Sequence, residues 1–382
     1  MTRPHSPGSF DLAVVGAGIV GLATALAGAR RGMRVVVVDR DAQPNGASVR
    51  NFGFVTVTGQ EPGAMWSRAR RSREIWLEVA AAAGIPIVHT GLWMTVRRPE
   101  SLAVLEAFMA TDMAAGCRII GPAEARRRFP QLKAPHLAAV LESTIELRVE
   151  SREAIPRIAA WLDESFGVAF LRSTEVQGID LPKVHTSRGI LQAERVAVCP
   201  GDDFNALYPE RFALHSVVRC KLQMQRLAAP GYRLPATLMS DLSLDRYAGY
   251  AALAPAAALK DRLRADQAEY VKHGVHLIVV QSADGTLVVG DSHHYAATPD
   301  PFSLEEIDAL ILEEFRAALG IEPPPAIERW IGTYASAARP VLIDAPERAV
   351  RIATVTSGAG ASVGFAIGEE VVAGLLEGGT FA

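Results

Sequence analysis

The size and charge of the chain exclude several classes of protein before any motif is considered. It has 382 residues, which at roughly 150 residues per domain predicts two or three domains with a large buried core. Hydrophobic residues make up 49% and charged residues 21%, and 39 Lys and Arg against 42 Asp and Glu leave a net charge of -3. These values exclude a disordered chain and a small disulfide-stapled scaffold, and they disfavour electrostatic binding of nucleic acid or of an anionic membrane.

The cysteine content predicts a reducing, cytoplasmic location. Cys117, Cys199 and Cys220 are odd in number, lie far apart and show no CxxC spacing. Zinc and disulfide frameworks are therefore not indicated.

One uncharged stretch of eighteen residues, 12–29, has about the minimum length of a membrane helix. Gly16, Gly18 and Gly21 interrupt it, and Arg30 and Arg31 follow it directly. We therefore predict no membrane span, and instead a buried strand followed by a packed helix.

The N-terminal half of the chain begins with a predicted βαβ unit. Residues 1–10 are expected to be a disordered tail. The hydrophobic pattern then predicts a strand, a glycine turn, a helix and a second strand, at 11–15, 16–18, 19–31 and 35–38. Further helices are expected at 63–83, 99–115 and 152–164, with a strand near 92–96. Short strands at 168–171, 174–179 and 195–198 are expected to rejoin the first sheet.

The C-terminal half changes to antiparallel patterns. Strands are predicted at 214–227, 238–250, 276–281 and 286–290, with a hairpin at Asp284-Gly285. A helix at 303–319 is expected to begin with a capping box of Ser303 and Glu306. A strand at 350–355 and a helix at 362–376 close the pattern.

The first turn matches the dinucleotide-binding fingerprint. Gly16, Gly18 and Gly21 follow a strand and open a helix, and Asp39 ends the next strand. The glycines permit a tight turn, close approach of a pyrophosphate and close packing of helix on strand, while Asp39 suits a ribose diol. The alternative is a glycine turn without a nucleotide.

Two further segments favour FAD over a nicotinamide cofactor. The Gly-rich loop 46–53 follows the second strand, where a nicotinamide dehydrogenase would begin another βα unit. The turn 357–364 repeats the strand, small-residue turn and helix pattern, and such a helix end could face the flavin edge that gains charge on reduction. The alternative for the loop 46–53 is an ordinary surface loop, and the alternatives for the turn 357–364 are a second phosphate-binding turn and plain close packing.

These motifs, in this order, resemble the FAD-dependent D-amino-acid oxidase and glycine (sarcosine) oxidase family. The resemblance rests on DLAVVGAGIVGLATALAGARRGMRVVVVDR, GASVRNFG, AVCPGDD and VTSGAGASVGFAIGEEVV, and it covers nearly the whole chain. Within the family, NFGFVTVTGQEPGAMWSRARRSREIWLE and GDSHHYAATPDPF resemble a bacterial branch proposed to act in phosphonate catabolism, on 2-aminoethylphosphonate or its N-methyl form.

The resemblance implies an α/β fold in two discontinuous domains. A Rossmann-like FAD-binding domain of the GR2 type would comprise 10–85, 145–212 and 326–382. A second α+β substrate-binding domain on an antiparallel sheet would comprise 86–144 and 213–325.

The resemblance also implies a set of FAD-binding residues. They are Gly16, Gly18, Ile19, Val20, Gly21, Asp39, Arg40, Ser48, Arg50, Asn51, Phe52, Gly53, Val176, Cys199, Pro200, Gly201, Gly358, Gly360, Ala361, Ser362, Val363 and Gly364. The Cys199-Pro200-Gly201 segment departs from the residues usual in the family, and Asp39 replaces a common Glu.

For the substrate, the resemblance implies Arg339 as the clamp on an anionic group, because a guanidinium donates two parallel charged hydrogen bonds. Tyr247 and Tyr250 are either substrate contacts or core aromatics. His293 or His294 could hold an anionic head group or accept a proton, with at most one of them facing the substrate. A metal site of His273, His276, Asp291 and His293 is the alternative, but no metal is expected, since no predicted helix places two ligands on one face.

The predicted function is oxidation of the C–N bond of a small anionic amine by hydride transfer to flavin N5. The resulting imine would hydrolyse to an aldehyde or oxo acid and to ammonia or an amine, with oxygen or another acceptor taking the electrons. The alternatives are an oxidase of glycine, sarcosine or D-amino acids, a nicotinamide-linked dehydrogenase, and a non-catalytic FAD-binding subunit.

Overall fold

A parallel sheet forms one half of the molecule. The computed structural model describes residues 9–377. The parallel strands lie in the order β8-β3-β2-β12-β19, where β2 (Leu12–Val15) is the central strand. The others are β3 (Val35–Val38), β8 (Ala169–Leu171), β12 (Val196–Val198) and β19 (Val350–Ser357). The predicted βαβ unit is therefore present.

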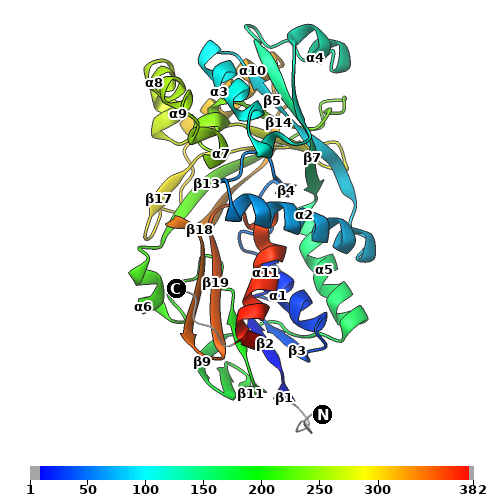
Figure 1. The fold of residues 1–382 in the computed structure, drawn as a ribbon, viewed down its shortest axis with the longest axis vertical. Coiled ribbons are helices and arrows are strands. Elements are labelled where there is room, and N and C mark those ends of the chain that lie inside the picture. The colour runs from blue at the N-terminus through cyan, green and yellow to red at the C-terminus, as the bar shows by residue number, and fades with distance from the viewer. Residues whose placement is uncertain (1–8, 378–382) are drawn as a thin grey trace.

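Both faces of this sheet are covered, which explains its unbroken runs of apolar residues. Side chains alternate between the faces, so Leu12 and Val14 pack with the helices while Ala13 packs on the other side. Figure 1 shows three helices together on the first face: α1 (Ile19–Ala29), α5 (Ser151–Phe166) and α11 (Gly360–Glu377).

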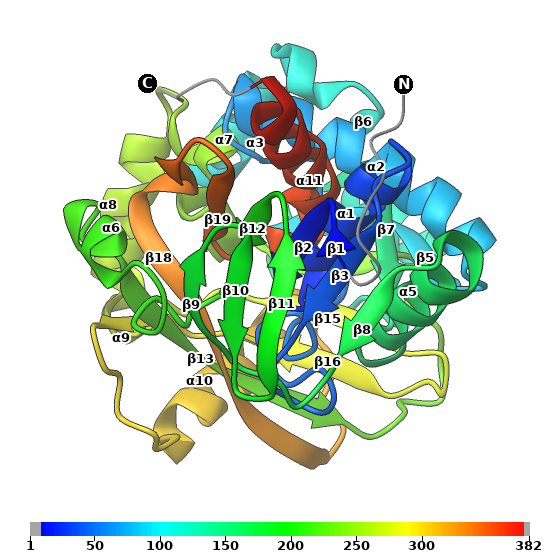
Figure 2. The same cartoon turned by 90° about the horizontal axis from the view of Figure 1, so that it is seen from below.

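A small sheet covers the opposite face, as Figure 2 shows. Its order is β1-β11-β10-β9, with β1 (Ser9–Phe10), β9 (Val176–Asp180), β10 (Lys183–Thr186) and β11 (Gly189–Ala193). Two predictions are thereby corrected. Residues 174–179 do not rejoin the first sheet, and Ser9 and Phe10 form a strand, while residues 1–8 of the predicted tail lie outside the described part.

The other half is a largely antiparallel sheet that continues the first. Its order is β4-β7-β5-β14-β15-β16-β13-β18, and only β5 and β14 run parallel within it. The strands are β4 (Phe54–Val55), β5 (Ile87–Val96), β7 (Ala139–Val149), β13 (Val218–Leu227), β14 (Thr237–Ser240), β15 (Ile278–Gln281) and β16 (Leu287–Gly290), with β6 (Cys117–Ile120) and β17 (His294–Ala296) at the side. The predicted β15–β16 hairpin is confirmed.

The long strand β18 (Ala326–Glu347) joins the two halves. Its first part pairs with β13 and its second part pairs with β19. The register shifts between Ser336 and Val341, so residues 337–340 bulge out of the ladder where the halves meet.

Most of the remaining helices lie around the antiparallel half or beside the α1 layer, while α6 lies near β18 and packs in the cluster on the opposite face of the parallel sheet (Figure 1). They are α2 (Ala64–Ala82), α3 (Pro99–Met109), η1 (Asp112–Ala114), α4 (Pro122–Arg128), α6 (Pro209–Leu214), η2 (Asp241–Asp245), α7 (Ala248–Ala251), α8 (Ala256–Asp266), α9 (Ala268–Lys272) and α10 (Glu305–Leu319). None of the helices in residues 9–377 is long and apolar enough to cross a membrane.

Two sequence predictions fail in this half. Residues 238–250 form a strand only to Ser240 and then turn into η2 and α7. The helix predicted at 303–319 begins at Glu305, and its N-cap is Leu304 without a side-chain cap, so the box of Ser303 and Glu306 does not form.

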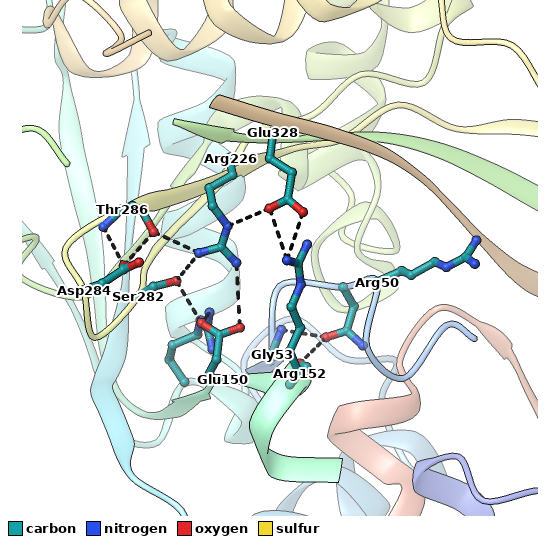
Figure 3. Close-up of polar contacts among 12 residues, drawn as sticks. Arg50, Gly53, Glu150, Arg152, Arg226, Ser282, Asp284, Thr286 and Glu328 are labelled. Carbon is teal, nitrogen blue, oxygen red and sulfur yellow. Dashed lines mark hydrogen bonds and ion pairs between the residues drawn. The ribbon is translucent and has the colours of Figure 1, made fainter. Parts of the chain in front are cut away.

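An ionic cluster ties the start of α5 to the antiparallel sheet (Figure 3). Arg226 on β13 donates to Glu328 on β18 (Nε–O 3.2 Å), and its other side faces Glu150 at 4.0 Å. Arg152 on α5 reaches the same Glu328 at 3.0 Å. These contacts link the start of α5, in the parallel half, to strands β13 and β18 of the antiparallel half.

Candidate functional site

A cavity of about 330 Å³ extends from the glycine turn of the parallel sheet into the antiparallel sheet. From the parallel half it is lined by residues of the α1 turn, the loop 46–53, the end of β12 and the start of α11. From the antiparallel half it is lined by Leu222, Met224, Arg246, Tyr247, His276, Ile278, Asp291, His293, Thr333 and Tyr334. Many of the predicted cofactor residues and some of the predicted substrate residues thus share one cavity.

Backbone packing requires glycine at the first turn. Gly16 has a φ of +98°, and a Cβ there would lie 2.3 Å from the carbonyl oxygen of Cys199. A Cβ on Gly21 would lie 1.9 Å from the carbonyl oxygen of Gly16. The turn therefore brings the N-terminus of α1, with Gly18 and Ile19, against the cavity, where its N–H groups suit an anion.

Asp39 and Ser48 hold this turn in place. Asp39 accepts hydrogen bonds from the amides of Ala17 at 2.6 Å and Asp41 at 2.8 Å, and the Ser48 hydroxyl accepts one from Ile19 N at 2.9 Å. Asp39 does not line the cavity itself, whereas Ser48 does. Arg40 forms an ion pair with Asp203.

The loop 46–53 is ordered by its own side chains. Asn51 donates to the carbonyl of Ala47 at 2.7 Å and accepts from Gly53 N at 2.6 Å. Gly53 has a φ of +63°, and a Cβ there would lie 1.9 Å from Val149 O. Arg50, Asn51 and Phe52 line the cavity, and Gly53 lies behind them.

The second small-residue turn is present at the start of α11. Gly358, Gly360, Ala361 and Ser362 line the cavity. Val363 is fully buried in the core, and a Cβ on Gly364 would lie 3.2 Å from Ile19 Cγ1. These last two positions therefore pack α11 against α1.

The remaining predicted cofactor residues also fall into two groups, those that line the cavity and those that do not. Cys199 and Gly201 line the cavity, while Pro200 does not. Burial raises the pKa of the Cys199 thiol to about 12, so it stays protonated. Val176 lies outside the cavity lining, in the core between the small sheet and the parallel sheet.

The structure separates the two candidate histidines. His293 lines the cavity, whereas His294 lies on β17 outside it and contacts His273 (Nε2–Nδ1 3.0 Å). The tyrosines separate too. Tyr247 lines the cavity, but Tyr250 is a core aromatic whose ring packs 4.7 Å from that of Phe108.

Arg339 lies in the bulge of β18, and its side chain is exposed and outside the cavity lining. Its carbonyl oxygen accepts a hydrogen bond from Thr356. The next residue, Pro340, reaches the cavity instead.

Sequence reasoning missed a different arginine. Arg246 lies between η2 and α7, lines the cavity and donates to the Tyr295 hydroxyl at 2.8 Å. It was not selected because residues 238–250 were predicted to form one continuous strand, with no turn near Arg246. Its neighbour Tyr247, which the family resemblance did select, was the available signal.

From the sequence, His276 and Asp291 were considered only as part of an alternative metal site; both lie beside His293. His276 Nε2 lies 2.9 Å from Asp291 Oδ1, and its Nδ1 lies 3.1 Å from the Ser243 hydroxyl. His293 Nε2 lies 3.9 Å from Asp291 Oδ2, and its Nδ1 lies 2.9 Å from Gly274 O.

Burial and neighbouring charges set the ionisation of this group. Burial lowers the pKa of His293 well below its ordinary value, so the imidazole is neutral near pH 7. Burial opposes charge on Asp291 as well, but the adjacent imidazoles and Arg246 outweigh it and lower the pKa of the carboxyl. Burial, followed by the charge of Asp291, raises the pKa of Tyr247.

The residues at the glycine turns fit FAD as the cofactor. Two helix N-termini meet the cavity, and at Gly16 and Gly21 a Cβ would overlap backbone atoms. Asp39 and Ser48, two of the predicted FAD-binding residues, accept hydrogen bonds from backbone amides of the first of these turns. FAD would supply the redox chemistry when bound.

Comparison with solved structures shows the same fold. Glycine oxidase from Bacillus cereus is 17% identical, with a TM-score of 0.77 over 96% of this chain and 95% of that one. L-proline dehydrogenase from P. horikoshii is 19% identical, with a TM-score of 0.78 over 98% and 95%. L-alpha-glycerophosphate oxidase from Mycoplasma pneumoniae, solved with FAD bound, is 15% identical, with a TM-score of 0.76 over 96% and 95%.

A search of curated protein sequences returned no match. The family described as FAD dependent oxidoreductase (DAO) matches residues 11–373, nearly the whole chain. The protein therefore belongs to the DAO family of FAD-dependent oxidoreductases.

Proposed function

We propose that this protein oxidises the C–N bond of a small anionic amine, either an amino acid or an aminophosphonate such as 2-aminoethylphosphonate or its N-methyl form. The observation that carries the proposal is the single cavity shared by the glycine turns and by Arg246 and His293. Two of the proteins with this fold are named for oxidising glycine and L-proline, which are anionic amines.

Arg246 is the anchor that we propose for the anionic end, in place of the exposed Arg339. Tyr295 uses part of its guanidinium, and no carboxylate in the described residues lies within 4.0 Å of it. The remaining N–H groups are free to form charged, two-point hydrogen bonds to a carboxylate or phosphonate. Tyr247 and Tyr334 line the cavity nearby and would restrict the size of the substrate.

In this proposal the chain binds and orients the substrate, while bound FAD would accept the hydride. The amine reacts in its neutral form, after its ammonium has given up a proton to water. Loss of the hydride from the carbon bearing it then leaves an iminium ion, which water converts to an aldehyde or oxo acid and to ammonia or an amine. The glycerophosphate oxidase neighbour shows that this fold also serves a substrate without an amine. The choice of an amine therefore rests on the cavity residues and on the sequence resemblance.

The test is anaerobic reduction of the purified holoenzyme. We expect flavin absorbance near ~375 and ~450 nm, and bleaching of the ~450 nm band by at least one compound among glycine, sarcosine, D-amino acids, 2-aminoethylphosphonate and its N-methyl form. Glycerol 3-phosphate serves as the comparison without an amine. Bleaching by glycerol 3-phosphate alone, or by none of the compounds, would contradict the proposal.

A further inference from the structure

Two opposite charges line the antiparallel end of the cavity without pairing with each other. Asp291 is 5% exposed, and the groups within 4.0 Å of its carboxylate are the imidazoles of His276 and His293. Within residues 9–377 no Lys or Arg nitrogen lies that close to Asp291, and no carboxylate oxygen lies that close to Arg246. The imidazoles and the more distant Arg246 favour the charged carboxylate, but no Lys or Arg of residues 9–377 pairs with it directly. A buried carboxylate is stabilised most by a direct charged partner, so this arrangement leaves a place for a cationic ligand.

The hydrogen bonds of His293 fix which of its nitrogens faces Asp291. Its Nδ1 lies 2.9 Å from Gly274 O, and a carbonyl oxygen can only accept, so Nδ1 carries the proton of the neutral ring. Nε2 is then an acceptor, and it lies 3.9 Å from Asp291 Oδ2, another acceptor. Nothing in the described chain donates between these two atoms.

On this geometry, and resting on the proposed function, we propose that Asp291 Oδ2 and His293 Nε2 form a subsite for the substrate's ammonium group. A primary or secondary ammonium has at least two N–H donors and a positive charge, so it can donate to both acceptors at once. His276, held by Ser243 at 3.1 Å, lies against the other carboxylate oxygen and orients it. With Arg246 on the anionic end, the cavity recognises a short zwitterion by both of its charges.

This subsite selects one of the two roles expected from the sequence for His293, contact with the substrate's amine and not with its anionic head group. A neutral ring that faces the cavity with an unprotonated nitrogen repels an anionic head group and accepts from an amine. The anionic end is therefore directed to Arg246, which places the carbon bearing the amine between the two charged groups.

The experiment measures binding to the anaerobically reduced holoenzyme by calorimetry, so that no turnover occurs. The ligands are glycine and 2-aminoethylphosphonate, their amine-free counterparts acetate and ethylphosphonate, and ethylamine. The proteins are the wild type, D291N, R246Q, and D308N as a matched control. Asp308 is also buried in the antiparallel half, but it bonds Gln223 outside the cavity lining.

We expect the wild type to bind each amino anion about 10-fold or more tightly than its amine-free counterpart, the size of one charged hydrogen bond. D291N should lose this preference, because the amide no longer attracts the ammonium and can donate to His293 itself. Amine-free anions should bind D291N more tightly than the wild type, since a negative charge is gone. R246Q should weaken all anions alike, and D308N should match the wild type.

Three results would overturn the subsite. One is a wild type that binds amine-free anions as tightly as amino anions, which is informative even if D291N fails to fold. The second is a D291N protein that keeps the preference. The third is a stoichiometric metal in the purified protein whose removal abolishes ligand binding, since His276, Asp291 and His293 each offer a ligand atom within 4.8 Å of the other two and could bind a metal instead. If amino anions reduce the flavin while any of these holds, the subsite alone is wrong; if no amine reduces or binds the protein, the proposed function is wrong too.

Discussion

The two ends of the cavity are built by different means. The end at the parallel sheet is made of backbone: glycines, a helix N-terminus and amides held by Asp39 and Ser48. The end at the antiparallel sheet is made of side chains, such as Arg246 and Asp291, that come from segments far apart in the sequence. Backbone sites tolerate little change at their glycines, whereas side-chain sites can change their ligand by single substitutions. The first end therefore suits a cofactor shared across the family, and the second is the end at which we propose that the substrate binds.

The largest effect should come from placing a side chain in the backbone-built end. In Gly21→Val, even the Cβ would lie 1.9 Å from Gly16 O, so the turn or α1 must move. We expect loss of bound FAD, measured as flavin absorbance per protein after gel filtration. Gly46→Ala is the control, because a Cβ there meets nothing within 4 Å. Normal FAD content in Gly21→Val would show that the turn is not required to bind the cofactor.

The next effect concerns the stability of the antiparallel half, which carries the side-chain-built end of the cavity. Asp241 is fully buried, and its carboxylate accepts from Arg98 at 2.8 Å, Ser101 at 3.0 Å and Arg97 at 3.2 Å. We expect Asp241→Asn to lower the free energy of unfolding by about 3–5 kcal/mol, because Arg98 loses its counter-charge and Arg97 keeps only that of Glu314. Asp261→Asn, at an exposed position, is the control.

The pH dependence of stability gives a second measurement on the same residue. Burial opposes the charge of Asp241, but Arg97 and Arg98 outweigh it, and the pKa of the carboxyl is lowered on folding. A group with a lowered folded pKa stabilises the protein above its unfolded pKa of about 3.9, and this contribution is lost as the pH falls through the folded value. Asp241→Asn should therefore unfold with less pH dependence in acid than the wild type. An unchanged acid profile would contradict this account.

The third effect separates the two arginines proposed for the anionic end. Arg246→Gln should raise KM by about 10- to 100-fold, because a charged hydrogen bond to the substrate is lost. Arg339→Gln should change KM by less than about threefold, since its side chain is exposed outside the cavity lining. Steady-state kinetics on the FAD-loaded variants make the comparison. The opposite ranking would restore Arg339 as the anchor and remove Arg246.

The same contrast explains what the sequence could predict. The βαβ unit at 11–38 and the C-terminal strand and helix were predictable because apolar periodicity and glycine spacing are local signals. The turn near Asp241 was not predictable from the sequence, because residues 238–250 alternate as they would in a strand. The carboxylate of Asp241 and the ring of Tyr250 are buried only by contacts with distant parts of the chain. Nothing local links Arg246 to Asp291, which are 45 residues apart and meet only when the sheet forms.

The smallest effect concerns two tyrosines that the sequence could not distinguish. Tyr250 is 1% exposed, and within residues 9–377 its hydroxyl has no hydrogen-bond partner. Removing a buried hydroxyl that bonds nothing costs no hydrogen bond, so Tyr250→Phe should leave stability unchanged or raise it by up to about 1 kcal/mol, with kcat/KM unaltered. Tyr247→Phe should instead alter kcat/KM with little effect on the melting temperature, because Tyr247 lines the cavity beside Arg246. If Tyr250→Phe lowered kcat/KM as much as Tyr247→Phe, this distinction would be wrong. The core packing of Tyr250 against Phe108 would then help to shape the side-chain-built end of the cavity.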